Sequence, residues 1–102
     1  MVDLKLWIDD VRPAPEGYEQ IFTVNFAKEL IRICKEENIQ VELIDIDHDA
    51  GTYADCGGDY IKLLDWLEET GRNYPIRIHS ANVVGVENMR RIIQRNNWKE
   101  VF

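Results

Sequence analysis

LKLWIDD, residues 4–10, is a short apolar run that ends abruptly in two carboxylates. Such a run is typical of a buried β-strand. Two later stretches have the same form, VELIDIDHD at residues 41–49 and IRIHSAN at residues 76–82. In an open parallel α/β sheet the carboxyl ends of the strands share one edge, where ligands bind. We therefore expect one crevice to collect the polar residues of the three strand ends: Asp9, Asp10, Arg12, Asp47, His48, Asp49, His79, Ser80 and Asn82.

The chain of 102 residues is expected to form one domain, 1–102, with 45% hydrophobic and 30% charged residues. No apolar run approaches the roughly 18–20 residues that span a membrane, and the first residues lack the pattern of a secretory signal. Cys34 and Cys56 form neither a metal-binding spacing nor a disulfide framework. These features predict a cytoplasmic protein without a membrane partner.

The formal net charge is −7, from 12 basic and 19 acidic residues. This charge argues against an extended nucleic-acid binding face, which requires a basic surface. It is compatible with one terminal phosphate, because a divalent cation can reverse the local field. The expected partner is a small phosphorylated ligand or the cyclic-phosphate end of a nucleotide or RNA.

Alternating strands and helices predict a mainly parallel sheet with right-handed crossovers. We expect strands at 4–8, about 19–23, 40–46, 76–78 and 98–102, and helices at 26–37, from 60 to near 71, and from 82 or 85 to 93. Asn25 is a candidate cap of the first helix. Only about ten residues link the first two strands, fewer than a helical crossover needs. An irregular, proline-containing loop is therefore expected to replace the first helix.

The carboxylates of Asp9, Asp10, Asp47 and Asp49 are hard oxygen ligands that suit Mg²⁺ or Mn²⁺. Zinc fits less well, although the two histidines keep it open. The alternative is that these aspartates only stabilise turns. Asp45, inside the second run, is assigned no role.

His48 and His79 are the only histidines and both follow strands. An unperturbed imidazole titrates near ~6.5, so the two could act as general base and general acid, with Asp47 beside them. Capping or core packing is the alternative. Arg12, Ser80 and Asn82 are candidates for phosphate contact, although a surface salt bridge is an alternative role for the guanidinium.

Residues 6–15, 47–49, 78–82 and 85–89 together resemble the cyclic-phosphate processing receiver-like family, a derivative of the response-regulator receiver. The resemblance implies a receiver or flavodoxin-like α/β fold of about five strands and three helices, without the first and last receiver helices. It also implies that Asp9 and Asp10 hold Mg²⁺ and that Asp47 stands at the phospho-acceptor position. No lysine follows the fifth strand as in a receiver, because Lys99 falls inside the expected last strand.

The first hypothesis is therefore a metal-dependent cyclic phosphodiesterase, a hydrolase. The second is a degenerate receiver that senses phosphate or binds a protein without turnover, and the third is a regulatory module whose acidic face docks a basic protein. An uncovered strand at the C-terminus would allow a homodimer. On the first hypothesis, His79→Ala abolishes turnover and changes stability by at most about 1 kcal/mol.

Overall fold

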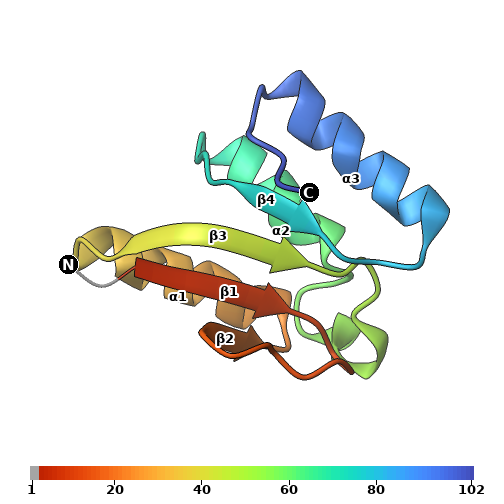
Figure 1. The fold of residues 1–102 in the computed structure, drawn as a ribbon, viewed down its shortest axis with the longest axis horizontal. Helices are drawn as coiled ribbons and strands as arrows, with labels where there is room; N and C mark the ends of the chain where they lie inside the picture. The colour runs from red at the N-terminus through yellow and green to blue at the C-terminus, as the bar shows by residue number, and fades with distance from the viewer. Residues whose placement is uncertain (1–2) are drawn as a thin grey trace.

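The computed structural model describes residues 3–102 as a fully parallel four-stranded sheet in the order β2-β1-β3-β4 (Figure 1). The receiver or flavodoxin-like α/β fold is confirmed, with four strands rather than five. The elements in chain order are β1 (Asp3–Ile8), β2 (Tyr18–Ile21), α1 (Val24–Glu36), β3 (Gln40–Ile46), the short 3₁₀ helix η1 (Gly51–Asp55), α2 (Ile61–Glu69), β4 (Ile76–Ile78) and α3 (Val83–Arg95).

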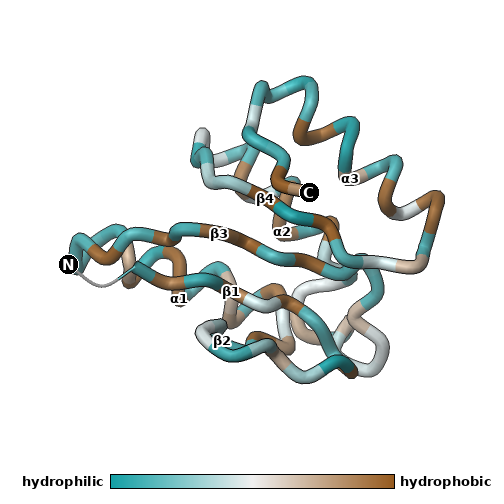
Figure 2. Tube along the Cα trace, viewed as in Figure 1, coloured by the Kyte–Doolittle hydropathy of each residue, from teal (hydrophilic) through white to brown (hydrophobic). Residues whose placement is uncertain are grey.

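Helices α1 and α2 lie on one face of the sheet, and α2 packs against both α1 and α3. The connections β2–α1–β3 and β3–α2–β4 cross the sheet in the same direction, so the right-handed rule puts α1 and α2 on the same face. Both helices lie behind the sheet in Figure 1, and α3 packs beside α2. Apolar residues concentrate along the strands and on the inward sides of the helices (Figure 2).

The opposite face of the sheet carries no helix within residues 3–102, and it is polar. A row of paired residues crosses all four strands on this face: Gln20, Trp7, Asp45 and Arg77. We call this row and its surroundings the helix-free face. The loop of residues 9–17 packs against it, because Trp7 Nε1 donates to the Arg12 carbonyl at 3.0 Å and Gln20 Nε2 donates to the Asp9 carbonyl at 2.9 Å. The expected irregular loop thus takes the position of a first helix.

The predicted fifth strand at 98–102 is wrong, because this segment makes only one isolated parallel bridge, between Ile76 and Glu100. β4 is three residues long, and Ile76 alone hydrogen-bonds to the 98–102 segment. Ile76 N donates to Lys99 O, and Val101 N donates to Ile76 O. Arg90 binds Glu100 through two nitrogens, which fixes the segment to α3. A homodimer through this edge remains a prediction, although the C-terminal strand on which the prediction was based is not formed.

Helix ends follow local hydrogen bonding. Thr23, not Asn25, caps α1, since the Thr23 side chain accepts from Phe26 N. Asn82 caps α3 by accepting from Gly85 N, which decides between the two starts considered for that helix. Gly71 has φ of +65° just after α2, the left-handed conformation that favours glycine at a helix end.

Candidate active site at the carboxyl ends of the strands

The backbone at the site continues the hydrogen-bond ladder of the sheet. Asp9, Asp47 and His79 each directly follow a strand, and each donates its backbone N–H to the last residue of a neighbouring strand, at 3.2, 2.9 and 2.9 Å. The acceptors are, in the same order, the carbonyls of Ile21, Ile8 and Ile46. The sheet itself therefore brings these three residues together, as the sequence predicts.

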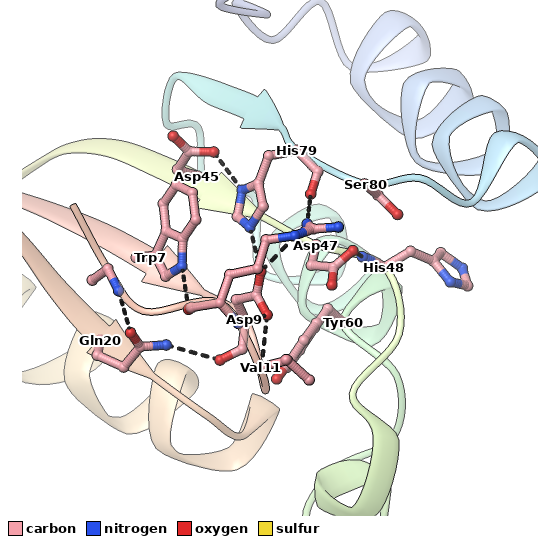
Figure 3. Close-up of polar contacts among 12 residues, drawn as sticks. Trp7, Asp9, Val11, Gln20, Asp45, Asp47, His48, Tyr60, His79 and Ser80 are labelled. Atoms are coloured by element: carbon pink, nitrogen blue, oxygen red, sulfur yellow. Dashed lines mark hydrogen bonds and ion pairs between the residues drawn. The ribbon is translucent and has the colours of Figure 1, made fainter.

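His79 lies between two carboxylates and on an indole ring (Figure 3). Its Nδ1 is 2.6 Å from Asp45 Oδ1 and its Nε2 is 2.9 Å from Asp9 Oδ2. The imidazole stacks on Trp7 with 3.8 Å between ring centroids and 8° between planes. Each ring nitrogen thus faces a carboxylate oxygen, to which it can donate when it carries hydrogen. These contacts hold the imidazole in place between Asp9 and Asp45.

Asp45 is the site residue that the sequence analysis left without a role. It is fully buried, and its second oxygen is 3.4 Å from Arg77 Nη1. A buried carboxylate needs a charged or hydrogen-bonding partner. The sequence feature that could have indicated a role for Asp45 is its position inside an apolar strand, on the same face as Asp47 two residues later.

Asp9 is fully buried as well and uses both oxygens. Its Oδ1 accepts from the backbone N–H groups of Val11 and Arg12, at 2.9 and 3.0 Å. Burial alone would raise the pKa of Asp9, but these two bonds and the contact with His79 outweigh burial and lower it. Asp9 is therefore a carboxylate at neutral pH, as a cation ligand must be.

Asp9, Asp10 and Asp47 form the acidic cluster of the site. Each offers one carboxylate oxygen, and these oxygens all lie within 4.8 Å of one another. A Cβ built on Gly51, whose φ is +58°, would overlap Asp10 Oδ2, so the bare glycine leaves room for this carboxylate. Three hard oxygen donors at this separation fit Mg²⁺ or Mn²⁺, which also bind phosphate oxygens and water. Asp49 lies outside this cluster and pairs with His48.

Tyr60 is a further buried polar residue beside the acidic cluster (Figure 3). Burial, together with the negative charges of Asp10, Asp9 and Asp47, raises the pKa of its phenol. The hydroxyl donates to the Phe22 carbonyl at 2.7 Å. Tyr60 is therefore a neutral donor that ties the segment after β2 to the start of α2.

His48 has a different environment from His79, and Figure 3 shows its ring pointing away from that residue. Its Nδ1 is 2.8 Å from Asp49 Oδ1, and this bond lowers the pKa of Asp49. A Cβ built on Gly85, in the first turn of α3, would overlap the His48 ring. With Nδ1–H donating to Asp49, the neutral ring presents Nε2 as an acceptor.

The predicted phosphate ligands lie around these groups. Arg12 Nη1 donates to the His79 carbonyl at 3.0 Å and lies 3.5 Å from Asp9 Oδ2, while the side chain is 49% exposed. Ser80 Oγ accepts from Asn82 N at 3.1 Å, which leaves its own hydrogen available for donation. Asn82 Nδ2 is 3.4 Å from both Asp49 oxygens.

Two surface hollows, of about 340 and 350 Å³, lie away from this site. Their lining residues surround the end of α1 and the turn before β4, and include none of the candidate site residues. Among the helices of residues 3–102, none has the length and apolar character needed to cross a membrane.

Comparison with known proteins gives the family. No curated protein and no solved structure matches the chain. A family model for the cyclic-phosphate processing receiver domain matches residues 4–95, a span that contains every strand end described above. The match covers most of the chain and agrees with both the parallel fold and the resemblance found in the sequence. The chain therefore belongs to the cyclic-phosphate processing receiver family, and its role is connected with the processing of cyclic phosphates.

Proposed function

We propose that the protein is a metal-assisted phosphoesterase that opens a cyclic phosphodiester to a phosphomonoester. The observation that carries this proposal is the acidic cluster at the carboxyl ends of the strands. His48, the residue after Asp47 in the chain, is oriented by Asp49. We further propose that the enzyme is cytoplasmic, in agreement with the free thiols of Cys34 and Cys56.

Asp9, Asp10 and Asp47 would hold the cation, Mg²⁺ or Mn²⁺. When bound, it would neutralise phosphate charge and make phosphorus a better electrophile. The two backbone N–H groups and the His79 ring that face Asp9 favour its ionised form. His79 would thus position Asp9, and direct proton transfer by its ring would require one carboxylate contact to break.

His48 is the residue that we propose for proton transfer. Water attacks phosphorus, its proton passes to His48 Nε2, and one ring P–O bond breaks. The leaving ribose oxygen then receives a proton from His48 or from solvent, which gives a phosphomonoester with one free hydroxyl. Arg12, Ser80 and Asn82 would contact the phosphate oxygens, and their donors suit the charge that develops there.

The first test is hydrolysis of 2′,3′-cyclic nucleotides and of an RNA with a 2′,3′-cyclic phosphate end, each with Mg²⁺, Mn²⁺ or EDTA. We expect metal-dependent ring opening that falls by at least about 100-fold in His48→Ala, the usual contribution of a positioned general acid–base. Asp47→Asn should also be inactive. Asp65→Asn removes an equal charge from the surface of α2 and should retain activity.

A second function is favoured by one observation, the engagement of both His79 nitrogens by carboxylates. A phosphate-sensing or protein-binding receiver needs the acidic cluster but no proton-transfer pair. Treatment with a small phosphodonor separates the two functions. An acid-labile gain of mass that is absent in Asp47→Ala, together with no ring opening, would contradict the phosphoesterase and support the receiver.

A further inference from the structure

An exposed pair of aromatic rings lies beside the acidic cluster. The rings of Phe22, directly after β2, and Tyr53, in η1, stack with 5.3 Å between centroids and 24° between planes. Their exposed fractions are 43% and 36%, so each ring presents much of its surface to solvent. Neither ring takes part in the polar site described above.

Short connections fix the place of this pair relative to the cluster. The carbonyl of Ile21, the residue before Phe22, accepts from the backbone N–H of Asp9 at 3.2 Å. On the other side, Gly51 begins η1, and its Cα faces the carboxylate of Asp10. Each ring is therefore one or two residues along the chain from a residue in contact with the cluster.

Hydrogen bonds of the neighbouring backbone also hold the pair in place. Tyr60 Oη donates to the Phe22 carbonyl at 2.7 Å, and Tyr53 N donates to the Ala50 carbonyl at 3.0 Å. The loop after η1 is tied to the start of α1 by Asn25 N, which donates to the Cys56 carbonyl at 3.1 Å. A pair fixed in this way offers a preformed surface, so binding there would cost little conformational entropy of the protein.

We propose that Phe22 and Tyr53 form a stacking platform for the base of a nucleotide whose phosphate lies at the acidic cluster. This inference rests on the proposed function and assigns the residues that would bind the base of a nucleotide substrate. Stacking on aromatic side chains tolerates any base, because every base has a π-face. The net charge of −7 disfavours the binding of further phosphates, which favours a single nucleotide or a terminal one.

The test is binding of adenosine 3′-monophosphate and of inorganic phosphate to the full chain, measured by calorimetry with Mg²⁺ present. We expect the nucleotide to bind at least about tenfold more tightly than phosphate, and Phe22→Ala and Tyr53→Ala to remove most of this margin. The affinity for inorganic phosphate should remain unchanged. Tyr53→Phe keeps an aromatic ring and should keep the margin.

Phe102→Ala is the matched control, since Phe102 is an aromatic residue with 90% exposure that contacts Arg90 outside the site. This variant should keep the preference for nucleotide over phosphate.

Equal affinity for nucleotide and phosphate in the wild type would overturn the platform. So would a preference for nucleotide that survives in both Phe22→Ala and Tyr53→Ala. No binding of the nucleotide at millimolar concentration would overturn it too. If the wild type does not open cyclic phosphates but both alanine variants lose the preference for nucleotide, the platform is supported and the phosphoesterase is contradicted. If both variants open cyclic phosphates as fast as the wild type, the phosphoesterase is supported and the platform is contradicted.

Discussion

Each oxygen of the Asp45 carboxylate faces a nitrogen of another side chain, His79 on one side and Arg77 on the other. We expect Asp45→Ala to lower the free energy of unfolding by about 1–3 kcal/mol, because it leaves the His79 ring, whose side chain is only 12% exposed, without one of its hydrogen-bond partners. Urea unfolding at neutral pH measures this change. Asp49→Ala is the control, because Asp49 pairs with His48 but is 60% exposed, and it should cost about 1 kcal/mol or less.

The same contacts change what the sequence predicts for His79→Ala. From the sequence alone, removal of His79 is expected to cost at most about 1 kcal/mol, as at a surface site. In the structure its side chain is only 12% exposed, and its loss leaves two buried carboxylates facing each other. A loss of activity in this variant would therefore be interpretable only beside a measurement of its stability.

Gly51→Ala tests the space around Asp10. The new Cβ would overlap Asp10 Oδ2 at a position whose φ is +58°, so either the carboxylate or the start of η1 must move. We expect Mn²⁺ affinity to fall by about tenfold or more, which corresponds to a loss of about 1.4 kcal/mol. Calorimetric titration measures the affinity.

Gly17→Ala is the matched control for this change. Gly17 also has a positive φ, of +89°, but a Cβ there meets nothing within 4 Å. Both variants carry backbone strain, and only the first disturbs a carboxylate. Equal Mn²⁺ affinity in the two variants would show that Asp10 does not hold the cation.

At the level of elements, the positions of β1, β3 and β4 were predictable because each is a short, mainly apolar run that ends in polar residues. This pattern placed β1, β3 and β4 within about one residue, and with them the meeting of Asp9, Asp47 and His79. The stacking of His79 on Trp7 could not be predicted, since this contact joins the ends of two strands that are not neighbours in the sheet. The segment at 98–102 was misassigned because its apolar residue Trp98 packs in the core without a strand.

Helices α2 and α3 are joined by Glu68, which accepts from Arg95 and Asn96. These hydrogen bonds lower the pKa of Glu68 from 4.5 to about 2. A carboxylate with a depressed pKa stabilises the fold above its unfolded pKa, and this contribution disappears as the pH falls toward the folded value. Acidification from about pH 4.5 should therefore remove the contribution of Glu68.

Glu68→Gln isolates this contribution. The variant should unfold at lower urea concentration than the wild type at pH 7, and the difference should shrink as the pH is lowered from 5 to 3. Glu69→Gln, an exposed neighbour on the same helix, is the control and should follow the wild type. A difference that is independent of pH would assign the effect to packing rather than to ionisation.

For the molecule as a whole, three carboxylate oxygens within 4.8 Å in a chain of net charge −7 repel one another. A cation that binds only the folded chain should therefore raise the melting temperature. At a concentration 100 times its dissociation constant, the stabilisation is about 2.7 kcal/mol, which corresponds to on the order of 10 °C for a domain of this size.

Thermal scans with MnCl₂, and with NaCl at equal ionic strength, measure this effect. The increase should be specific to the divalent salt, because screening acts equally in both solutions. Asp10→Asn should lose most of the increase, whatever its melting temperature without metal. An equal rise in both salts would contradict a metal site at the cluster.

The hydrogen bonds by which Asp9, Asp47 and His79 extend the ladder of the sheet have a consequence for how the protein loses activity. Active sites carried on mobile loops can lose their geometry at temperatures where the rest of the fold is intact. Here the amides that position the three residues bond to neighbouring strands, so we expect them to open together with those strands. Hydrogen exchange at these amides should be as slow as in the centre of β1 and β3, and inactivation on heating should coincide with the global melting of the domain.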